Sequence, residues 1–138
     1  MTDGSTKIVP LRNITPPSAE GRLASARPRV RVVLGPRHLG PGKTDLLEAI
    51  GRTGSISAAG REMGMSYRRA WLLVDEVNKM FTRPVVVSSV GGAHGGGAQL
   101  TDFGRALVAA YRRIEARTAQ AIREELAPFE SDLAEPED

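Results

Sequence analysis

The stretch from Gly54 to Trp71 reads G-S-I-S-A-A-G-R-E-M-G-M-S-Y-R-R-A-W and has the pattern of two short helices joined by a tight turn. Ser55 is a good N-cap for the first helix, and Gly64 suits the left-handed residue that ends it. Ser66 then caps the second helix. This order predicts a helix-turn-helix, the motif whose second helix enters the major groove of DNA.

The second helix presents one apolar stripe and leaves its first turn exposed. The stripe has helical spacing and comprises Ala70, Leu73, Val74, Val77 and Phe81. Arg68 and Arg69 then face outward, where two cations oppose the helix macrodipole by about 0.3–1 kcal/mol each. Phosphates and guanine edges would compensate, so we expect this turn to contact double-stranded DNA. A solvated basic face is the alternative for the arginine pair taken alone.

The residues after the second helix predict a wing. Arg83-Pro84 should stop the helix, and the β-branched run Val85 to Val90 is typical of a strand. A glycine-rich loop from Gly91 to Gly97 leads to a second short strand, Ala98 to Leu100. Glycines at the tip would let the backbone approach a phosphate chain closely, although a flexible loop without a role is the alternative.

The predicted DNA contacts come from the helix pair and the wing tip. Tyr67 would bind a phosphate through its hydroxyl, and Ser57 and Arg61 would touch the backbone from the preceding helix. Trp71 is interpreted as a core or dimer-facing residue. The full set is Ser57, Arg61, Ser66, Tyr67, Arg68, Arg69, Gly92, His94, Gly95 and Gly96.

The segment before the helix pair predicts a strand, a loop and a helix. Arg29 to Leu34 alternates as a strand does, and we expect it to join the wing sheet. Gly35 to Thr44 ends in G-K-T but lacks the glycine spacing of a nucleotide-binding loop, so it is interpreted as a connection. Thr44 or Asp45 would cap the next helix, with Asp45 and Glu48 as a capping box. Its core face would be Leu46, Leu47, Ala49 and Ile50, and Gly51 with Gly54 would end it.

A long helix should begin after Thr101 and end at Pro128. Its apolar stripe is longer than one small domain requires, so we expect a homodimer formed through this helix. The dimerisation residues would be Leu107, Tyr111, Ile114, Thr118 and Ile122. Packing of the same stripe within one chain is the alternative.

Two runs of this sequence resemble the N-terminal DNA-binding domain of ModE-type molybdate-responsive transcriptional regulators. They are S-I-S-A-A-G-R-E-M-G-M-S-Y-R-R-A-W and G-G-A-H-G-G-G-A-Q-L-T-D-F-G-R-A-L, within a similarity from about Arg29 to Ile122. The LysR-type helix-turn-helix is similar over a shorter span. The resemblance implies a cytoplasmic, dimeric, sequence-specific DNA-binding regulator linked to molybdenum metabolism. A winged-helix module that binds another protein instead of DNA is the alternative function.

In this family, small β-barrel modules that bind molybdate follow the DNA-binding domain, and this chain ends at Asp138 without room for them. We therefore expect no molybdate binding in this chain. It is either a natural single-domain form or a piece of a longer protein, and the acidic ending E-S-D-L-A-E-P-E-D favours the former.

The composition fits this interpretation. The chain has 138 residues and a formal net charge of +3, and its charge is unevenly distributed. Lys and Arg dominate the first 43 residues, whereas every charged residue after Arg123 is acidic. The absence of Cys and the distance between His38 and His94 argue against a metal site, and we expect no enzyme and no cofactor. No apolar run or leader sequence is evident, so we expect a cytoplasmic protein without membrane contact.

The expected fold is mainly α with a small antiparallel sheet, a winged helix-turn-helix followed by a long C-terminal dimerisation helix. Residues 1–28 would form a disordered arm, residues 29–127 the winged domain with its helix, and residues 128–138 an acidic tail.

Overall fold

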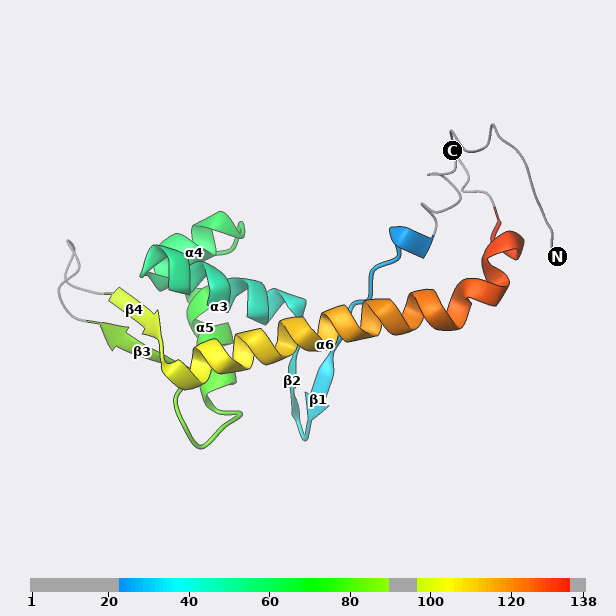
Figure 1. Ribbon diagram of the computed structural model, residues 1–138. Coiled ribbons are helices and arrows are strands. Elements are labelled where there is room, and N and C mark those ends of the chain that lie inside the picture. The colour runs from blue at the N-terminus through cyan, green and yellow to red at the C-terminus, as the bar shows by residue number, and fades with distance from the viewer. Residues whose placement is uncertain (1–22, 90–96, 135–138) are drawn as a thin grey trace. The chain divides into compact units, whose positions relative to one another are not determined.

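The computed structural model describes residues 23–89 and 97–134 (Figure 1). The described residues divide into two compact units, one within residues 29–115 and the other made of residues 23–28 and 116–134. The first is called the winged unit below. In chain order the elements are β1 (Val32–Leu34), β2 (Arg37–Leu39), α3 (Pro41–Thr53), α4 (Ile56–Glu62), α5 (Tyr67–Asn78), β3 (Val86–Ser89), β4 (Gly97–Leu100), α6 (Asp102–Leu126) and the 3₁₀-helix η1 (Ala127–Asp132).

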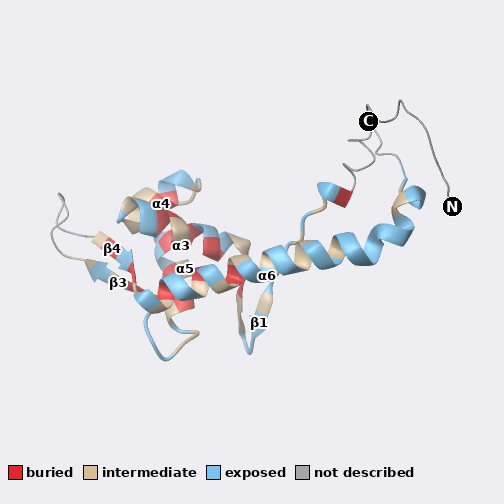
Figure 2. Cartoon of the chain, viewed as in Figure 1, coloured by how far each residue is buried: buried red, intermediate tan, exposed pale blue. Residues whose placement is uncertain are grey.

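The core of the winged unit is built from one face of each element. Figure 2 shows its buried residues, in red, gathered where α3, α4, α5, the β3–β4 hairpin and the first turns of α6 meet. Leu46, Leu47 and Ile50 of α3 are almost fully buried, and each such side chain contributes about 1.5–3 kcal/mol. The predicted core faces of α3 and α5 are confirmed, since Ala70, Val74 and Val77 are buried as well. The expected mainly helical fold with small antiparallel sheets is confirmed.

The helix-turn-helix forms as the sequence predicts. Ser55 Oγ accepts a hydrogen bond from the Ala58 amide at 3.0 Å, and Ser66 Oγ accepts one from the Arg69 amide at 3.1 Å. Gly64 has φ +70°, the left-handed conformation that the turn requires. Ser55 and Ser66 therefore cap α4 and α5, and Gly64 permits the tight turn that joins the two helices.

Helix α3 begins earlier than predicted. Gly40 is the N-cap and Pro41 occupies the first turn, where its missing amide leaves no donor unsatisfied. Thr44 is buried inside the helix and donates from Oγ1 to the Gly40 carbonyl at 2.9 Å, so the predicted cap at Thr44 or Asp45 is wrong. At the other end Gly54 takes φ +74° at the C-cap, as predicted, whereas Gly51 lies within the helix.

Helix α5 ends at Asn78, five residues before the predicted stop at Arg83. The Asn78 side chain accepts hydrogen bonds from the Val85 amide at 2.8 Å and the Val86 amide at 3.1 Å, and donates to the Val86 carbonyl at 3.0 Å. These bonds join the end of α5 to the start of β3. Phe81, predicted on the helix stripe, lies beyond the helix and packs edge-on against Phe103 with ring centroids 5.4 Å apart.

The two described hairpins are separate sheets, which corrects one prediction. In the wing, β3 and β4 pair antiparallel with Val86 opposite Leu100. The strand from the segment Arg29 to Leu34 does not join them. Instead β1 pairs with β2, with Val32 opposite Leu39, across a tight turn in which Gly35 has φ +64°. Part of the predicted loop Gly35 to Thr44 is therefore the strand β2, because the short turn after β1 brings the two strands side by side.

Helix α6 is anchored at its start and along the winged unit. Thr101 Oγ1 accepts a hydrogen bond from the Gly104 amide at 2.9 Å and donates to the Pro84 carbonyl at 2.7 Å, which confirms the predicted cap. The helix ends at Leu126, just before Pro128, and a 3₁₀-helix follows. Within the described ranges, no helix combines the length and the apolar character needed to cross a lipid bilayer.

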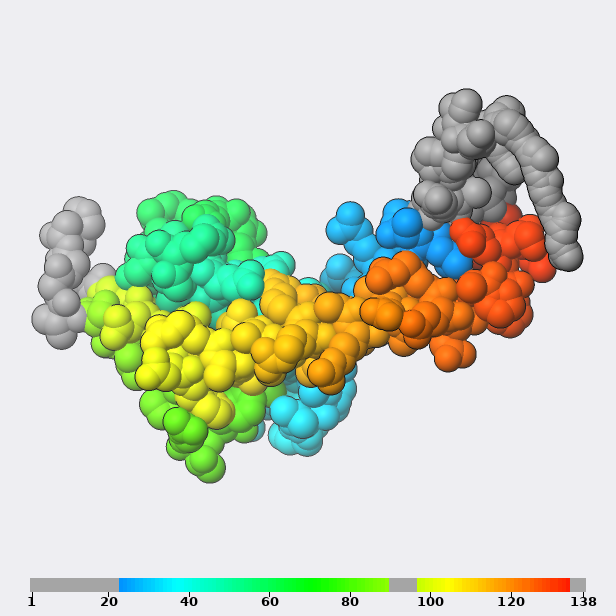
Figure 3. Space-filling view, viewed as in Figure 1, coloured from blue at the N-terminus to red at the C-terminus, as the bar shows by residue number. Residues whose placement is uncertain are grey.

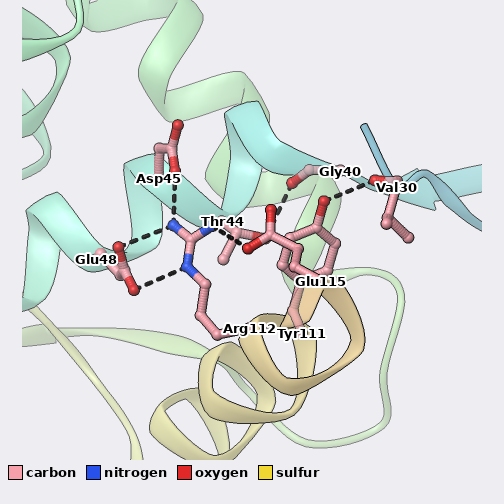
Figure 4. A network of polar contacts seen from close by, with 8 residues as sticks. All are labelled: Val30, Gly40, Thr44, Asp45, Glu48, Tyr111, Arg112 and Glu115. Carbon is pink, nitrogen blue, oxygen red and sulfur yellow. Dashed lines mark hydrogen bonds and ion pairs between the residues drawn. The ribbon is translucent and has the colours of Figure 1, made fainter. Parts of the chain in front are cut away.

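An ionic network holds α6 against α3 (Figure 4). Arg112 Nη2 lies 2.6 Å from Asp45 Oδ1 and 2.9 Å from Glu48 Oε1, and Arg112 Nη1 lies 2.9 Å from Glu115. The hydrogen bond from Arg112 lowers the pKa of Glu48 below its ordinary value. Asp45 and Glu48 therefore bind Arg112 and join α3 to α6, instead of forming the predicted capping box.

Candidate nucleic-acid interface

The first turn of α5 is the exposed feature around which the candidate interface is built. Opposite the buried face of Ala70, Val74 and Val77, the helix turns Arg68 and Leu72 outward. Tyr67 is 57% exposed and Leu72 46% exposed. Sequence reasoning missed Leu72, although its position one turn after Arg68 places both on the same face.

The two arginines of this turn have no partner among residues 23–89 and 97–134. Neither guanidinium forms a hydrogen bond or an ion pair with another residue of the described ranges, and both side chains are exposed. The backbone amide of Arg69, by contrast, donates the capping hydrogen bond to Ser66 Oγ. The cations at the positive end of the α5 dipole are thus left uncompensated.

A groove runs along one flank of α5, between this helix and the wing. It has a volume of about 380 Å³ and is lined by Tyr67 and Trp71 of α5, by the start of α4 and by β3 and β4. Trp71 is 46% exposed here, so it is not a core residue, and its predicted role as a dimer-facing residue stays a prediction. Trp71 follows Tyr67 by four residues, so the helical period alone could have placed both side chains on this flank.

Helix α4 carries two of the predicted contacts on one surface. Arg61 Nη1 donates to Ser57 Oγ at 3.0 Å, so the pair is held together one turn apart. Ser57 also lines the groove beside Tyr67. The structure therefore brings Ser57, Arg61 and the exposed end of α5 into one region of the winged unit.

The predicted contacts at the wing tip are Gly92, His94, Gly95 and Gly96, and they lie outside the described residues. The strands that lead to them, β3 and β4, are described and form the expected antiparallel pair.

The predicted dimerisation residues occupy different environments along α6. Tyr111 is 1% exposed, and its hydroxyl donates to the Val30 carbonyl at 2.6 Å, so it belongs to the core of its own unit (Figure 4). Burial raises the pKa of this hydroxyl. Leu107 is half-buried and packs against the same core. Ile114 is 40% exposed, whereas Thr118 and Ile122, which lie in the other unit, are half-buried.

Several curated proteins are similar to this chain in sequence. No protein-family model matches the chain. The molybdenum-pterin-binding protein MopB of Rhodobacter capsulatus is 50% identical over 95 residues, which are 69% of this chain and 34% of that protein. The molybdenum transport protein ModE of Azotobacter vinelandii is 47% identical over 56% of this chain and 28% of its own length. The DNA-binding transcriptional dual regulator ModE of Escherichia coli (strain K12) is 38% identical over 51% of this chain and 27% of its own.

A solved structure supports the fold. The Multiple Antibiotic Resistance Repressor, MarR, matches with a TM-score of 0.51 over 90% of this chain and 88% of that one, at 15% sequence identity. At this identity the likeness shows the fold alone, which is a winged helix. The predicted resemblance is confirmed: the chain is a homologue of the ModE and Mop proteins and spans about a third of the length of the first of these relatives.

Proposed function

We propose that the chain is a sequence-specific DNA-binding transcriptional regulator of the ModE type. The observation that carries this proposal is the first turn of α5, where Arg68 and Arg69 are exposed and have no partner among the described residues. A helix-turn-helix that leaves two cations unpaired at this point is suited to phosphates and guanine edges, which arginine binds in a bidentate manner. The name of the Escherichia coli relative, a DNA-binding regulator, supports the same conclusion.

In the proposed complex α5 enters the major groove. Arg68 and Leu72 would face base edges, and Tyr67, Ser57 and Arg61 would contact the sugar-phosphate backbone on the side of the wing. A homodimer would place two α5 helices about 34 Å apart, one turn of DNA, so the operator would be palindromic.

The setting of this regulation is proposed to be molybdenum metabolism in the cytoplasm. This follows the names of the relatives, which include a molybdenum transport protein and molybdenum-pterin-binding proteins. The aligned part is about a third of those relatives or less, so we propose no molybdate site within this chain.

The proposal is tested by selecting bound fragments from genomic DNA with the purified chain, with and without molybdate. We expect one palindromic sequence to be enriched, the same in both arms, and its affinity to fall steeply as salt rises. Enrichment of no sequence, with no salt-dependent binding to any duplex, would overturn the proposal and favour a module that binds protein.

A further inference from the structure

A second cavity lies on the flank of α5 that faces away from the wing. It has a volume of about 450 Å³, belongs wholly to the winged unit, and is lined by basic side chains from three segments. Arg29 and Arg31 come from the segment that enters β1, Lys43 from the first turn of α3, and Arg69 from the first turn of α5. Sequence reasoning did not connect these residues, because it expected Arg29 to Leu34 to join the wing sheet.

The cavity keeps a net positive charge after its internal contacts are made. Lys43 is 5% exposed and is satisfied by the His38 carbonyl at 2.6 Å and by Glu76 at 3.0 Å, which is the acidic group facing it. Arg29 and Arg69 are exposed and form no hydrogen bond or ion pair through their guanidinium groups with the described residues. The guanidinium groups of Arg29, Arg31 and Arg69 therefore have no carboxylate partner within the described ranges.

His38 adds a neutral wall rather than a charge. Arg31 Nη2 lies 3.1 Å from His38 Nδ1, and since a guanidinium only donates, this nitrogen accepts. Partial burial, followed by the positive charges of Lys43 and Arg31, lowers the pKa of His38. The start of α3 at Pro41 and Gly42 also borders the cavity and brings the positive end of a helix dipole to it.

Arg68 and Arg69 of α5 lie on different faces of the helix, and only Arg69 lines the cavity. Successive residues of an α-helix are about 100° apart, so Arg68 lies in the outward row with Leu72, while Arg69 lies in the next row with Leu73, which also lines the cavity. In Figure 3 the β1–β2 hairpin that carries part of this wall is the cyan projection of the surface. A helix in the major groove has a phosphate strand on each side, and the wing occupies only one flank of α5.

We propose that this cavity binds a backbone phosphate of the DNA strand opposite the wing, through Arg69, Arg31 and Arg29. Arg69 then fixes the position of α5 on the duplex, whereas Arg68 reads sequence. The inference rests on the proposed function and adds to it a second phosphate contact on the flank that the wing does not cover.

The experiment compares Arg69→Ala and Arg31→Ala with Arg68→Ala, and uses Arg113→Ala, an exposed α6 arginine outside the cavity, as the matched control. Affinity is measured on the selected operator and on an unrelated duplex over a range of salt. Each cavity variant should weaken both duplexes about equally, by about three- to tenfold, and reduce the magnitude of the salt slope by about one. Arg68→Ala should instead lower the ratio of operator to unrelated binding.

A second arm locates the phosphate. Methylphosphonate linkages, which carry no charge, replace single operator phosphates in turn. At one linkage on the strand opposite the wing, the substitution should lower the affinity of the native chain for the operator but have little further effect on the affinity of Arg69→Ala. No such linkage would overturn the inference.

The outcomes separate this inference from the proposed function. Selective operator binding with salt slopes of Arg69→Ala and Arg31→Ala equal to that of Arg113→Ala would overturn the phosphate site and leave the function standing. Binding of inorganic phosphate that Arg69→Ala abolishes, with unchanged DNA slopes, would make the cavity a site for a free anion and overturn the inference. Failure to bind any duplex would overturn both.

Discussion

Single residues decide where the elements of this chain begin and end. Ser55, Gly64 and Ser66 act through local bonds and backbone angles, so the sequence predicted them correctly. Asn78 was missed because its amide bonds to residues seven and eight positions later, and no periodicity reveals such a bond. Local chemistry could be predicted at this scale, whereas a side chain that joins two elements could not.

At Gly104 helix α6 packs closely against the backbone of Val85, the residue that precedes β3. A Cβ there would collide with the Val85 carbonyl oxygen, which accepts a hydrogen bond from the Thr101 amide at 3.0 Å. Gly104→Ala should therefore lower the free energy of unfolding by about 1–3 kcal/mol, measured by urea denaturation, despite the better helix propensity of alanine.

Gly42→Ala is the control for Gly104→Ala. A Cβ at Gly42 meets no atom within 4 Å, and the residue lies in the first turn of α3. This variant should leave stability unchanged or raise it by up to about 1 kcal/mol. Equal stability of the two variants would contradict the close packing of α6 on Val85.

At the scale of elements, the helices could be predicted from their apolar periodicity, but the pairing of the strands could not. The segment Arg29 to Leu34 alternates as a strand, yet alternation does not say which partner it takes. The tight turn at Gly35 pairs β1 with β2, the strand that follows it directly in the sequence. The same limit hid the basic cavity, since its wall depends on where the β1–β2 hairpin lies.

The contact between α3 and α6 gives a prediction of pH dependence. The pKa of Glu48 is lowered by Arg112, so its contribution to stability is complete above about 4.5, its ordinary pKa, and is lost as the pH falls through the lower value of the folded chain. Arg112→Gln should lower the free energy of unfolding by about 1 kcal/mol at pH 7, because the pairs are partly exposed.

Urea denaturation at pH 7 and at pH 3 measures this effect. The difference between the native chain and Arg112→Gln should be smaller at pH 3 than at pH 7, because the stabilisation linked to the lowered pKa of Glu48 diminishes as the pH falls below about 4.5. Arg113→Gln serves as the control, since Arg113 is an exposed neighbour that forms no hydrogen bond or ion pair with the described part of the chain. A loss of stability for Arg112→Gln that is the same at both pH values would contradict the ionic network.

At the scale of the whole molecule, the stripe along α6 serves more than one purpose. Tyr111 and Leu107 pack within the winged unit, so part of the stripe predicted for the dimer is core. The sequence could not separate the two roles, because both demand apolar residues at the same helical period. The proposed dimer contact is therefore carried by the later part of the stripe, which includes Ile122.

Sedimentation equilibrium tests the dimer. We expect the mass of two chains at micromolar concentration and a shift towards one chain for Ile122→Glu, because a charge buried in an apolar interface is costly. Ala109→Glu, at an exposed position of α6, should remain dimeric. A native chain of monomer mass at these concentrations would contradict the proposed dimer.

Whether the exposed first turn of α5 reads DNA can be measured as the sequence selectivity of binding. The ratio of affinities for the selected operator and an unrelated duplex is determined at one salt concentration for the native chain, Arg68→Ala and Arg113→Ala. We expect Arg68→Ala to lose about 1–3 kcal/mol of this discrimination and Arg113→Ala to keep it. If the ratio were unchanged for Arg68→Ala, the first turn of α5 would not be the part of the chain that reads DNA.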